Sequence, residues 1–271
     1  MDGAMGTELI RLGADSGDNL ARLSLSRPGL VLDVHRAYVA AGAEVILTNT
    51  FQANPQTIAD KSELRQVGQS AAELARQAGA TYVLADIGPI ITGRYTEFEK
   101  LDDLRRTAEV ISPVHGILLE TCSSENILKL IEQLRPAIGE SPLLLSLAFC
   151  HRPAGLQTYD GHEPEWFAAR AKQAGVDALG VNCGLEITPS DCVEIIRRFR
   201  AMTGLPLFAR PNAGTPEIAE GGVAYPHSPV DFAAVTPDLV GAGANMIGGC
   251  CGTTPEHIAA MCDHIRKIHP A

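Results

Sequence analysis

Residues 178–210 read ALGVNCGLEITPSDCVEIIRRFRAMTGLPLFAR, and this stretch decides the fold. The run Ala178–Cys183 is almost continuously apolar, which is typical of a strand buried on both faces of a sheet. Ser190–Met202 carries its apolar residues at helical spacing and ends near Gly204, and Leu205–Arg210 then forms a second apolar run. A strand, a helix and a second strand in this order predict a βαβ unit with parallel strands.

The same alternation extends along the chain, with apolar runs spaced by about 35 residues, the size of a βα unit. The other expected strands are Val45–Phe51, Tyr82–Ile90, Gly116–Cys122, Leu143–Phe149 and Asn245–Gly249. The other expected helices include Pro28–Ala41, Lys61–Gln77, Pro164–Ala174 and Pro255–Ile268. We therefore predict an α/β fold, a (β/α)₈ TIM barrel that forms one domain over residues 1–271.

The first strand is the weak point of this prediction. Closure of the barrel requires an eighth strand before the first helix, and Met1–Gly3 is where that strand would end. We therefore expect the first strand to be truncated. A doubly wound open sheet is the alternative, since it also alternates strands with helices.

Composition excludes several classes of protein. The chain has 22 Lys+Arg against 32 Asp+Glu, so its formal net charge is −10, which disfavours nucleic-acid binding. No apolar run approaches the ~20 residues that span a bilayer. The N-terminal residues lack the features of a signal peptide, and the seven Cys are an odd number. We expect reduced thiols in the cytoplasm, available for metal binding or catalysis.

Three of these thiols follow expected strands, where barrel enzymes place their active sites. Cys183 follows one strand, and Cys250 with Cys251 follows the last. Adjacent residues of a strand point to opposite faces, but the glycines around this pair allow the backbone to turn. Three thiolates can hold Zn²⁺ with one position open. The alternatives are a pair of small buried side chains or a vicinal disulfide.

The remaining cysteines are weaker candidates for functional residues. We expect Cys122, Cys192 and Cys262 to be core residues. Cys150 precedes His151 at a strand end, and a role for that pair stays open.

Five stretches resemble the homocysteine S-methyltransferase family, most closely the homocysteine-binding domain of cobalamin-dependent methionine synthase. They are residues 2–9 (DGAMGTEL), 47–54 (LTNTFQAN), 180–184 (GVNCG), 211–214 (PNAG) and 248–258 (GGCCGTTPEHI). The resemblance implies a barrel with a zinc ion on Cys183, Cys250 and Cys251. It also implies that Glu120 and Asp2 bind the homocysteine amino group, and that the main chain around Gly3 and Thr7 receives the carboxylate.

The implied reaction is transfer of a methyl group to the thiol of homocysteine, giving methionine. A free thiol is mostly protonated at neutral pH, whereas a coordinating thiol is deprotonated. Glu120 and Asp2 then orient the substrate, although each could instead form a buried ion pair or a helix cap. Asn182, Asn212 and Asn49 could hydrogen-bond the thiolates or the substrate, or could hold turns.

The methyl donor is open at this stage. Candidates are a separate methyl-corrinoid protein and a small sulfonium such as S-methylmethionine. Betaine is less favoured, because Thr121 stands where betaine-using relatives have Tyr. A cationic donor would suit an aromatic cage, for which Tyr95, Tyr159, Trp166 and Tyr225 are available in post-strand loops.

Two other functions are possible from the sequence. A phosphate-binding lyase or aldolase would use the Gly-rich ends of the last strands, but none of the five Lys follows a strand as a Schiff-base residue would. A non-catalytic subunit that binds homocysteine and zinc is the second alternative.

Overall fold

The computed structural model describes residues 1–89, 97–111, 114–184, 186–219 and 222–268. Its helices are α1 Gly6–Arg11, the 3₁₀ helix η1 Leu20–Arg22, α2 Leu23–Ser26, α3 Pro28–Ala40, α4 Lys61–Gln77, α5 Glu97–Ile111, α6 Asn126–Ile138, α7 Pro164–Ala174, α8 Pro189–Met202, α9 Pro229–Ala233, α10 Thr236–Ala242 and α11 Pro255–Ile268. Its strands are β1 Val45–Leu47, β2 Tyr82–Ile87, β3 Gly116–Cys122, β4 Leu143–Leu147, β5 Cys150–Arg152, β6 Gly155–Gln157, β7 Ala178–Asn182, β8 Leu207–Arg210, β9 Glu217–Ala219, β10 Gly222–Ala224 and β11 Met246–Ile247.

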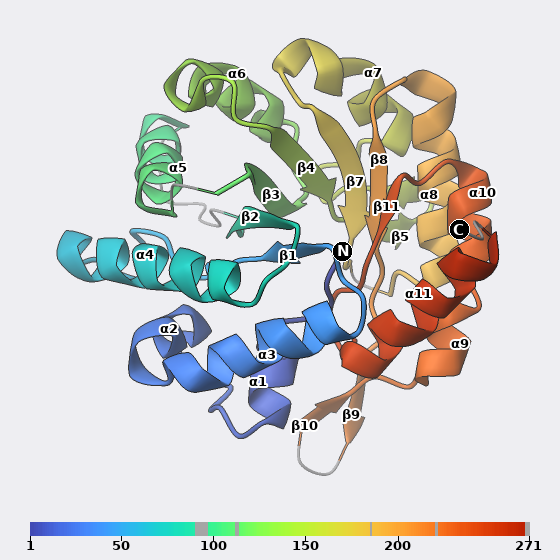
Figure 1. Cartoon of the computed structure of the whole chain (residues 1–271). Helices are drawn as coiled ribbons and strands as arrows, with labels where there is room; N and C mark the ends of the chain where they lie inside the picture. Colours follow the sequence, from blue (N-terminus) through green and yellow to red (C-terminus); the bar gives the residue numbers. More distant parts are fainter. Residues whose placement is uncertain (90–96, 112–113, 185, 220–221, 269–271) are drawn as a thin grey trace.

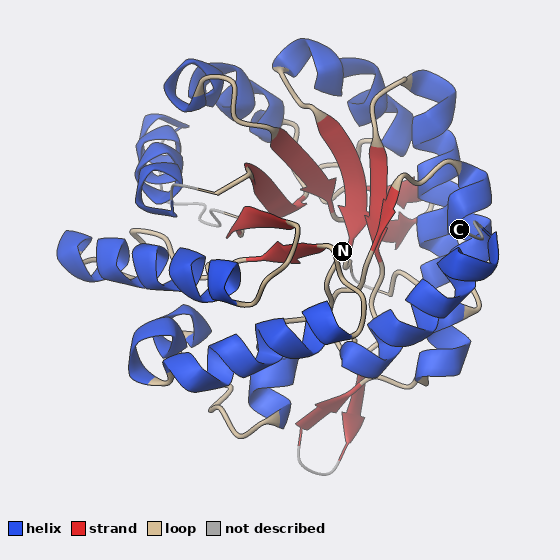
Figure 2. Ribbon diagram, viewed as in Figure 1, coloured by secondary structure: helices blue, strands red, loops and turns tan. Residues whose placement is uncertain are grey.

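One curled parallel sheet forms the centre of the molecule. Its seven strands follow the order β1-β2-β3-β4-β7-β8-β11, and the helices surround it as an outer layer (Figures 1 and 2). Neighbours in the sheet are neighbours in the sequence, whereas a doubly wound sheet reverses its order at a switch point. The barrel-like architecture is thus confirmed and the doubly wound alternative is wrong.

The N-terminal residues join the two edges of this sheet. Residues 1–3 form no regular strand, but the Asp2 N–H donates to Val45 O of β1 at 2.8 Å. On the other side, Gly249 N–H donates to Asp2 O at 2.9 Å and the Met1 ammonium to Ile247 O at 2.6 Å. At the position of the expected first strand, Met1 and Asp2 thus bridge β1 and the end of β11 without forming a regular strand.

The interior of the sheet consists of an apolar layer below a polar layer. The apolar layer is a cluster of buried side chains at Leu47, Leu84, Leu118, Leu144, Ala178 and Phe208. Side chains alternate along a strand, so residues two positions further on point to the same interior. Within four of these strands those residues are polar and buried, namely Asp86, Glu120, Ser146 and Arg210, and Asn49 just beyond β1 is also polar and buried. These buried polar side chains, here called the polar floor, thus lie on the hydrophobic layer at the carboxyl ends of the strands.

Most of the expected strands end earlier than their apolar runs because the chain turns. Thr50 N–H bonds back to Thr48 O at 2.8 Å, so the chain beyond Leu47 leaves the ladder. At the end of β4, Ala148 N–H still bonds to Cys122 O of β3. Two hairpins, β5–β6 and β9–β10, lie outside the sheet and were not expected. In Figure 1, β9–β10 projects from the body of the molecule.

The helices begin where the sequence supplies caps. Asp60 accepts the Glu63 N–H at the start of α4, and Thr188 with Asp191 forms a capping box at α8. On α8, Arg197 pairs with Glu194 at the surface, while Arg198 binds Glu165 of α7. Across the described residues, no helix combines the length and apolarity needed to cross a bilayer.

Gly180 provides a test of the interior packing. A Cβ atom at this position would lie 2.4 Å from the ring of fully buried Phe208, its partner in the β7–β8 ladder. Gly180→Ala should therefore lower the free energy of unfolding by about 1–3 kcal/mol through overpacking. Gly29→Ala, in α3 with open space around the position, is the matched control and should cause no loss. Urea unfolding of both variants would measure this, and equal stability would contradict the packing.

Candidate functional site

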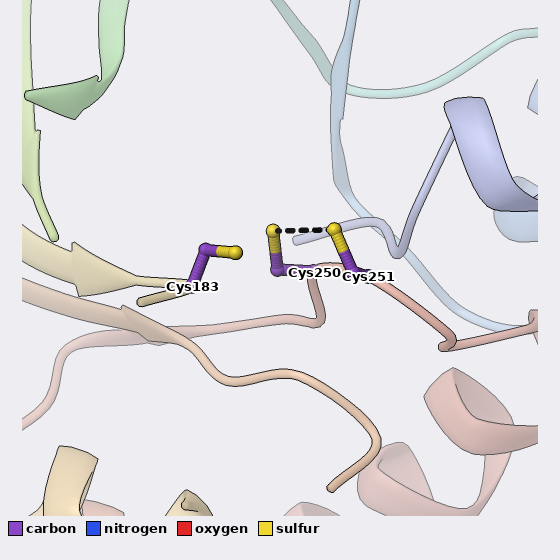
Figure 3. Close-up of side chains that lie close together, drawn as sticks. All are labelled: Cys183, Cys250 and Cys251. Atoms are coloured by element: carbon purple, nitrogen blue, oxygen red, sulfur yellow. Dashed lines mark hydrogen bonds between the residues drawn. The ribbon is translucent and has the colours of Figure 1, made fainter. Parts of the chain in front are cut away.

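Three thiols converge at the carboxyl ends of β7 and β11. The Sγ atoms of Cys183, Cys250 and Cys251 all lie within 4.8 Å of one another. Figure 3 shows the Cys183 side chain directed toward Cys250. The Sγ atoms of Cys250 and Cys251 are 4.0 Å apart. The three expected metal ligands are thus brought together by two segments nearly seventy positions apart in the sequence.

The backbone around these thiols is held in unusual conformations. Cys183 has a φ of 37°, in the left-handed region that costs a non-glycine residue about 1–3 kcal/mol. Gly252 has a φ of 79°, and a Cβ atom there would lie 2.1 Å from Tyr225. Cys250 N–H donates to Pro211 O, and Cys251 O accepts from Ala213 N–H, so the loop after β8 fixes the loop after β11.

The three sulfurs share hydrogen bonds and charge. Hydrogen bonding from Cys250 and Cys251 lowers the pKa of Cys183, so its thiolate is the favoured form. Hydrogen bonding to Cys183 raises the pKa of Cys250 well above its usual value and that of Cys251 to about 12. A cluster with one thiolate and two thiols can bind a metal cation, which displaces the protons of the two thiols.

Two asparagine side chains contact the cluster. Asn182 Nδ2 lies 3.7 Å from Cys250 Sγ, and Asn212 Nδ2 lies 3.5 Å from Cys183 Sγ. Asn182 also accepts hydrogen bonds from Ser146 Oγ at 2.6 Å and Thr121 N–H at 3.2 Å. The expected hydrogen bonds from Asn182 and Asn212 to the thiols are therefore present.

Next to the thiols lies a cluster of buried charges around Arg210. This guanidinium hydrogen-bonds to Glu120 through Nη1, and its Nη2 lies 3.3 Å from Asp2 Oδ1. Arg210, Glu120 and Asp2 are 3%, 6% and 2% exposed. Burial raises the pKa of both carboxyls, and the charge of Arg210 opposes that effect. In this structure the two expected amino-group ligands thus form a buried ion-pair network with an arginine.

A bulge in β3 places Glu120 in this cluster. The register of β3 against β4 shifts between Leu119 and Cys122, and Thr121 within the bulge has a φ of 60°. Such a value is an outlier for a β-branched residue, and bulges beside active sites redirect side chains. Thr121 is held there by Asn182, which binds both its N–H and its hydroxyl.

One cavity connects the thiols to the charges. Its volume is about 310 Å³, in the range of small-molecule sites. It is lined by the three cysteines, the buried charges and the N-terminal residues 2–7. The space can therefore hold a molecule that carries a thiol at one end and charged groups at the other.

The other expected site residues have structural partners. Asn49 lines the cavity, but its Nδ2 binds Leu20 O at 2.8 Å and so fixes the segment before α2. Thr7 Oγ1 accepts the Gly252 N–H at 3.1 Å and holds the cysteine loop. Gly3 has no room for a side chain, since a Cβ would lie 2.7 Å from Thr253 and Tyr38.

The remaining cysteines lie away from the cluster. Cys122 and Cys192 are buried in the core, and Cys262 packs against it from α11, as expected. Cys150 lies in hairpin β5–β6, where its Sγ contacts Gln157 O at 3.5 Å, and His151 pairs with Asp191. The structure thus gives Cys150 and His151 no place at the cavity.

The expected aromatic cage is not formed by the residues that the structure describes. Tyr159 is 79% exposed, Trp166 stacks on His162 of its own segment, and only Tyr225 reaches the thiols. Tyr95 lies outside the described residues. Tyr159 and Trp166 thus lie away from the cavity, where each contacts a neighbouring cation.

Sequence reasoning missed the roles of Arg210 and Asp86. Both were visible as polar residues at the ends of apolar runs, and both prove to be buried in the polar layer. The available signal was alternation, since each lies two residues beyond an interior residue of the apolar layer, Phe208 or Leu84.

Fold and site together define a TIM-barrel-like protein with a thiol cluster of metal-binding geometry at the barrel mouth. The family model described as homocysteine S-methyltransferase matches residues 1–265. The chain belongs to the homocysteine S-methyltransferase family.

Individual relatives agree with this assignment. A methionine synthase of Mycobacterium leprae is 30% identical over 99% of this chain, which spans only 24% of that relative. A homocysteine S-methyltransferase of Escherichia coli is 28% identical, over 96% of this chain and 93% of the relative. The solved metallated form of the E. coli homocysteine methyltransferase MmuM superposes with a TM-score of 0.81, at 26% identity over 97% of this chain and 95% of that one.

Removal of Arg210 should show that the buried charges depend on it. Arg210→Leu leaves two buried carboxyls without a counter-ion, so we expect a loss of about 3–5 kcal/mol in the free energy of unfolding. The matched control is Arg197→Leu, which breaks an exposed pair with Glu194 and should cost no more than about 1 kcal/mol.

The loss should also depend on pH. A carboxyl whose pKa is raised by folding binds its proton more readily in the folded state, so stability returns as pH falls toward that pKa. The difference between Arg210→Leu and the unaltered protein should be smaller at about pH 5 than at about pH 8. A pH-independent loss in denaturant unfolding would contradict this account.

Proposed function

We propose that this protein transfers a methyl group to the thiol of homocysteine and so forms methionine, with Zn²⁺ held by Cys183, Cys250 and Cys251. The observation that carries the proposal is one cavity lined by three convergent thiols and by buried carboxyls. Family membership and the likeness to a metallated relative support it.

The thiol cluster fits zinc. Tetrahedral coordination with Zn–S bonds of about 2.3 Å requires sulfurs about 3.8 Å apart, close to the spacing of this cluster. Three protein ligands leave one position for a substrate thiol, as in catalytic zinc sites. When bound, zinc supplies a Lewis acid that favours the thiolate form of the substrate at neutral pH.

The residues of the chain bind and orient the substrate. We assign Glu120 and Asp2 to accept hydrogen bonds from the substrate ammonium, which is positioning and involves no proton transfer. The main chain of Gly3–Thr7 lines the same cavity and is assigned to the carboxylate. Ala4 N–H is already bound to Thr253 Oγ1 at 3.0 Å, so we assign the substrate carboxylate to the neighbouring amides.

For the donor we propose a methyl-corrinoid protein that docks at the barrel mouth. A small cationic donor such as S-methylmethionine or betaine would need aromatic faces at the mouth. Tyr159 and Trp166 are engaged elsewhere, and Thr121 offers no ring. The described rings near the thiols are Phe51, which lines the cavity, and Tyr225, too few for a cage. The reduced thiols that the site requires fit the cytoplasm as the compartment.

The two alternative functions, a Schiff-base lyase and a non-catalytic subunit, have less support. A Schiff-base lyase needs a lysine in the cavity, whereas all five Lys lie on the outer helices α4, α5, α6, α7 and α11. A non-catalytic homocysteine- and zinc-binding subunit would keep the same site without turnover, so activity measurements separate it from the enzyme.

The zinc assignment can be tested at one ligand. Cys251→Ser should remove most of the zinc and lower methyl transfer by more than about 100-fold, since even outer contacts of a metal site are worth 10–100-fold. Elemental analysis of protein purified under reducing conditions, with and without homocysteine, gives the metal content. Cys262→Ser, outside the cluster, is the control and should keep both zinc and activity. Full activity of Cys251→Ser would contradict the assignment of Cys251 as a zinc ligand.

The amino-group assignment predicts a separable effect. Glu120→Gln replaces a charge-assisted hydrogen bond by a neutral one, so homocysteine should bind roughly tenfold more weakly while zinc content stays the same. Calorimetric titration with homocysteine measures this, with Glu194→Gln on the exposed face of α8 as the control. Unchanged affinity in Glu120→Gln would rule out the orienting role.

The donor is identified by supplying each candidate to the zinc-loaded protein. We expect methionine from a methyl-corrinoid donor and not from S-methylmethionine or betaine. Turnover with either small cation would replace the corrinoid proposal, and none with any donor would favour the non-catalytic subunit.

A further inference from the structure

The buried cluster contains a third carboxyl that the proposed mechanism leaves unused. Asp86, on β2, is 6% exposed and lines the same cavity as Asp2, Glu120 and Arg210. Arg210 pairs with Asp2 and Glu120, so three carboxyls share one guanidinium. Buried charges require partners. The protonation state of Asp86 therefore bears on what the cavity binds as well as on packing.

Strand register directs Asp86 toward Glu120. Asp86 pairs with Leu118 in the β2–β3 ladder, and Leu118 and Glu120 lie on the same face of β3. The backbone of Asp86 is fixed on both sides, because its N–H donates to Thr48 Oγ1 at 3.0 Å and its carbonyl accepts from Thr50 Oγ1 at 2.6 Å. The side chain therefore lines the same cavity as Glu120 and interacts with it electrostatically.

Two carboxyls in such contact share a proton. Like charges at hydrogen-bond distance in a buried site cannot both ionise, and one of the pair keeps its hydrogen. Burial, reinforced by the charge of Glu120, raises the pKa of Asp86 well above its usual value. Asp86 is thus the member of the pair that favours the neutral form.

A neutral Asp86 leaves both a charge and a hydrogen bond to be satisfied. With Asp2 and Glu120 ionised and Arg210 protonated, the side chains of the cluster sum to minus one. The nearby Met1 ammonium is already bound to Ile247 O. Asp86 Oδ1 is buried and has no hydrogen-bond partner. Buried acceptors without a partner are rare in folded proteins, and a ligand donor would complete this one.

We propose that Asp86, as a neutral carboxylic acid, is a third binding residue for the amino group of the substrate. Its O–H holds Glu120 ionised, and Oδ1 accepts a hydrogen bond from the ammonium. This inference rests on the proposed binding of homocysteine. The inference predicts that the pocket binds thiols that carry a protonated α-amino group and discriminates against thiols that lack one.

The test compares two thiols and two variants on the zinc-loaded protein. Homocysteine and 4-mercaptobutanoate differ only in the amino group, and calorimetry gives the dissociation constant of each. Asp86→Ala should weaken homocysteine binding roughly tenfold or more, the value of a hydrogen bond to a charged group, and leave 4-mercaptobutanoate within about twofold. Asp86→Asn supplies one N–H donor and one acceptor oxygen, as a protonated carboxyl does, and should bind homocysteine like the unaltered protein.

Other outcomes overturn the inference. Equal loss for both thiols in Asp86→Ala would mean a structural role, and equal loss in Asp86→Asn and Asp86→Ala would mean that Asp86 acts as an anion. If the unaltered protein binds 4-mercaptobutanoate as tightly as homocysteine, no amino-group pocket exists. If it binds neither thiol, the proposed function fails, and the inference fails with it.

A second measurement does not depend on the folding of Asp86→Ala. Infrared difference spectra between the unaltered protein and Asp86→Asn at neutral pH should show the carbonyl stretch of a protonated carboxylic acid. Loss of that band in the variant supports the neutral Asp86. Its absence from the unaltered protein overturns the inference.

Discussion

The ion-pair network around Arg210 is the constraint on which the site depends. It lies inside the barrel, where charged groups lose their hydration and must find partners within the protein. Replacement of such a network by apolar side chains is often neutral or stabilising, so its presence is weak evidence for a role in stability. Here the network rests on an apolar layer of Leu84, Leu118 and Phe208 and borders a cavity. It lies at the carboxyl ends of the strands, where barrel enzymes place their active sites.

The N-terminal segment depends on the same network and also completes the sheet. Asp2 contacts Arg210 with one carboxyl oxygen and accepts the Leu47 N–H with the other at 2.7 Å. Its main chain bonds to β1 and to Gly249, next to the cysteine pair. One residue therefore joins the edges of the sheet, the charge cluster and the thiol loop, so the fold and the site are assembled by the same contacts.

The sequence predicts the large elements well and the polar partnerships poorly. Apolar runs located all seven strands of the sheet, and the glycines around Cys250 indicated a turn that could bring thiols together. Strand ends were less accurate, because turns such as the one at Thr48 and Thr50 depend on local hydrogen bonds that apolar patterning does not encode. The pairing of Arg210 with Glu120 joins residues ninety positions apart and depends on register and on a bulge. Neither can be derived from the spacing of apolar residues.

Asn182 connects the two halves of the cavity. Its amide binds the N–H and the hydroxyl of Thr121, the residue that follows Glu120, and it also donates toward Cys250 Sγ. The carboxylate end and the thiol end are thus fixed relative to each other through one side chain that Ser146 holds from below. A substrate whose amino and thiol groups are separated by a short carbon chain needs such a fixed separation, because a misplacement of about 1 Å can cost about 100-fold in rate. In the proposed function the buried polar floor therefore positions both ends of the substrate, and its rigidity follows from the hydrogen bonds that satisfy it.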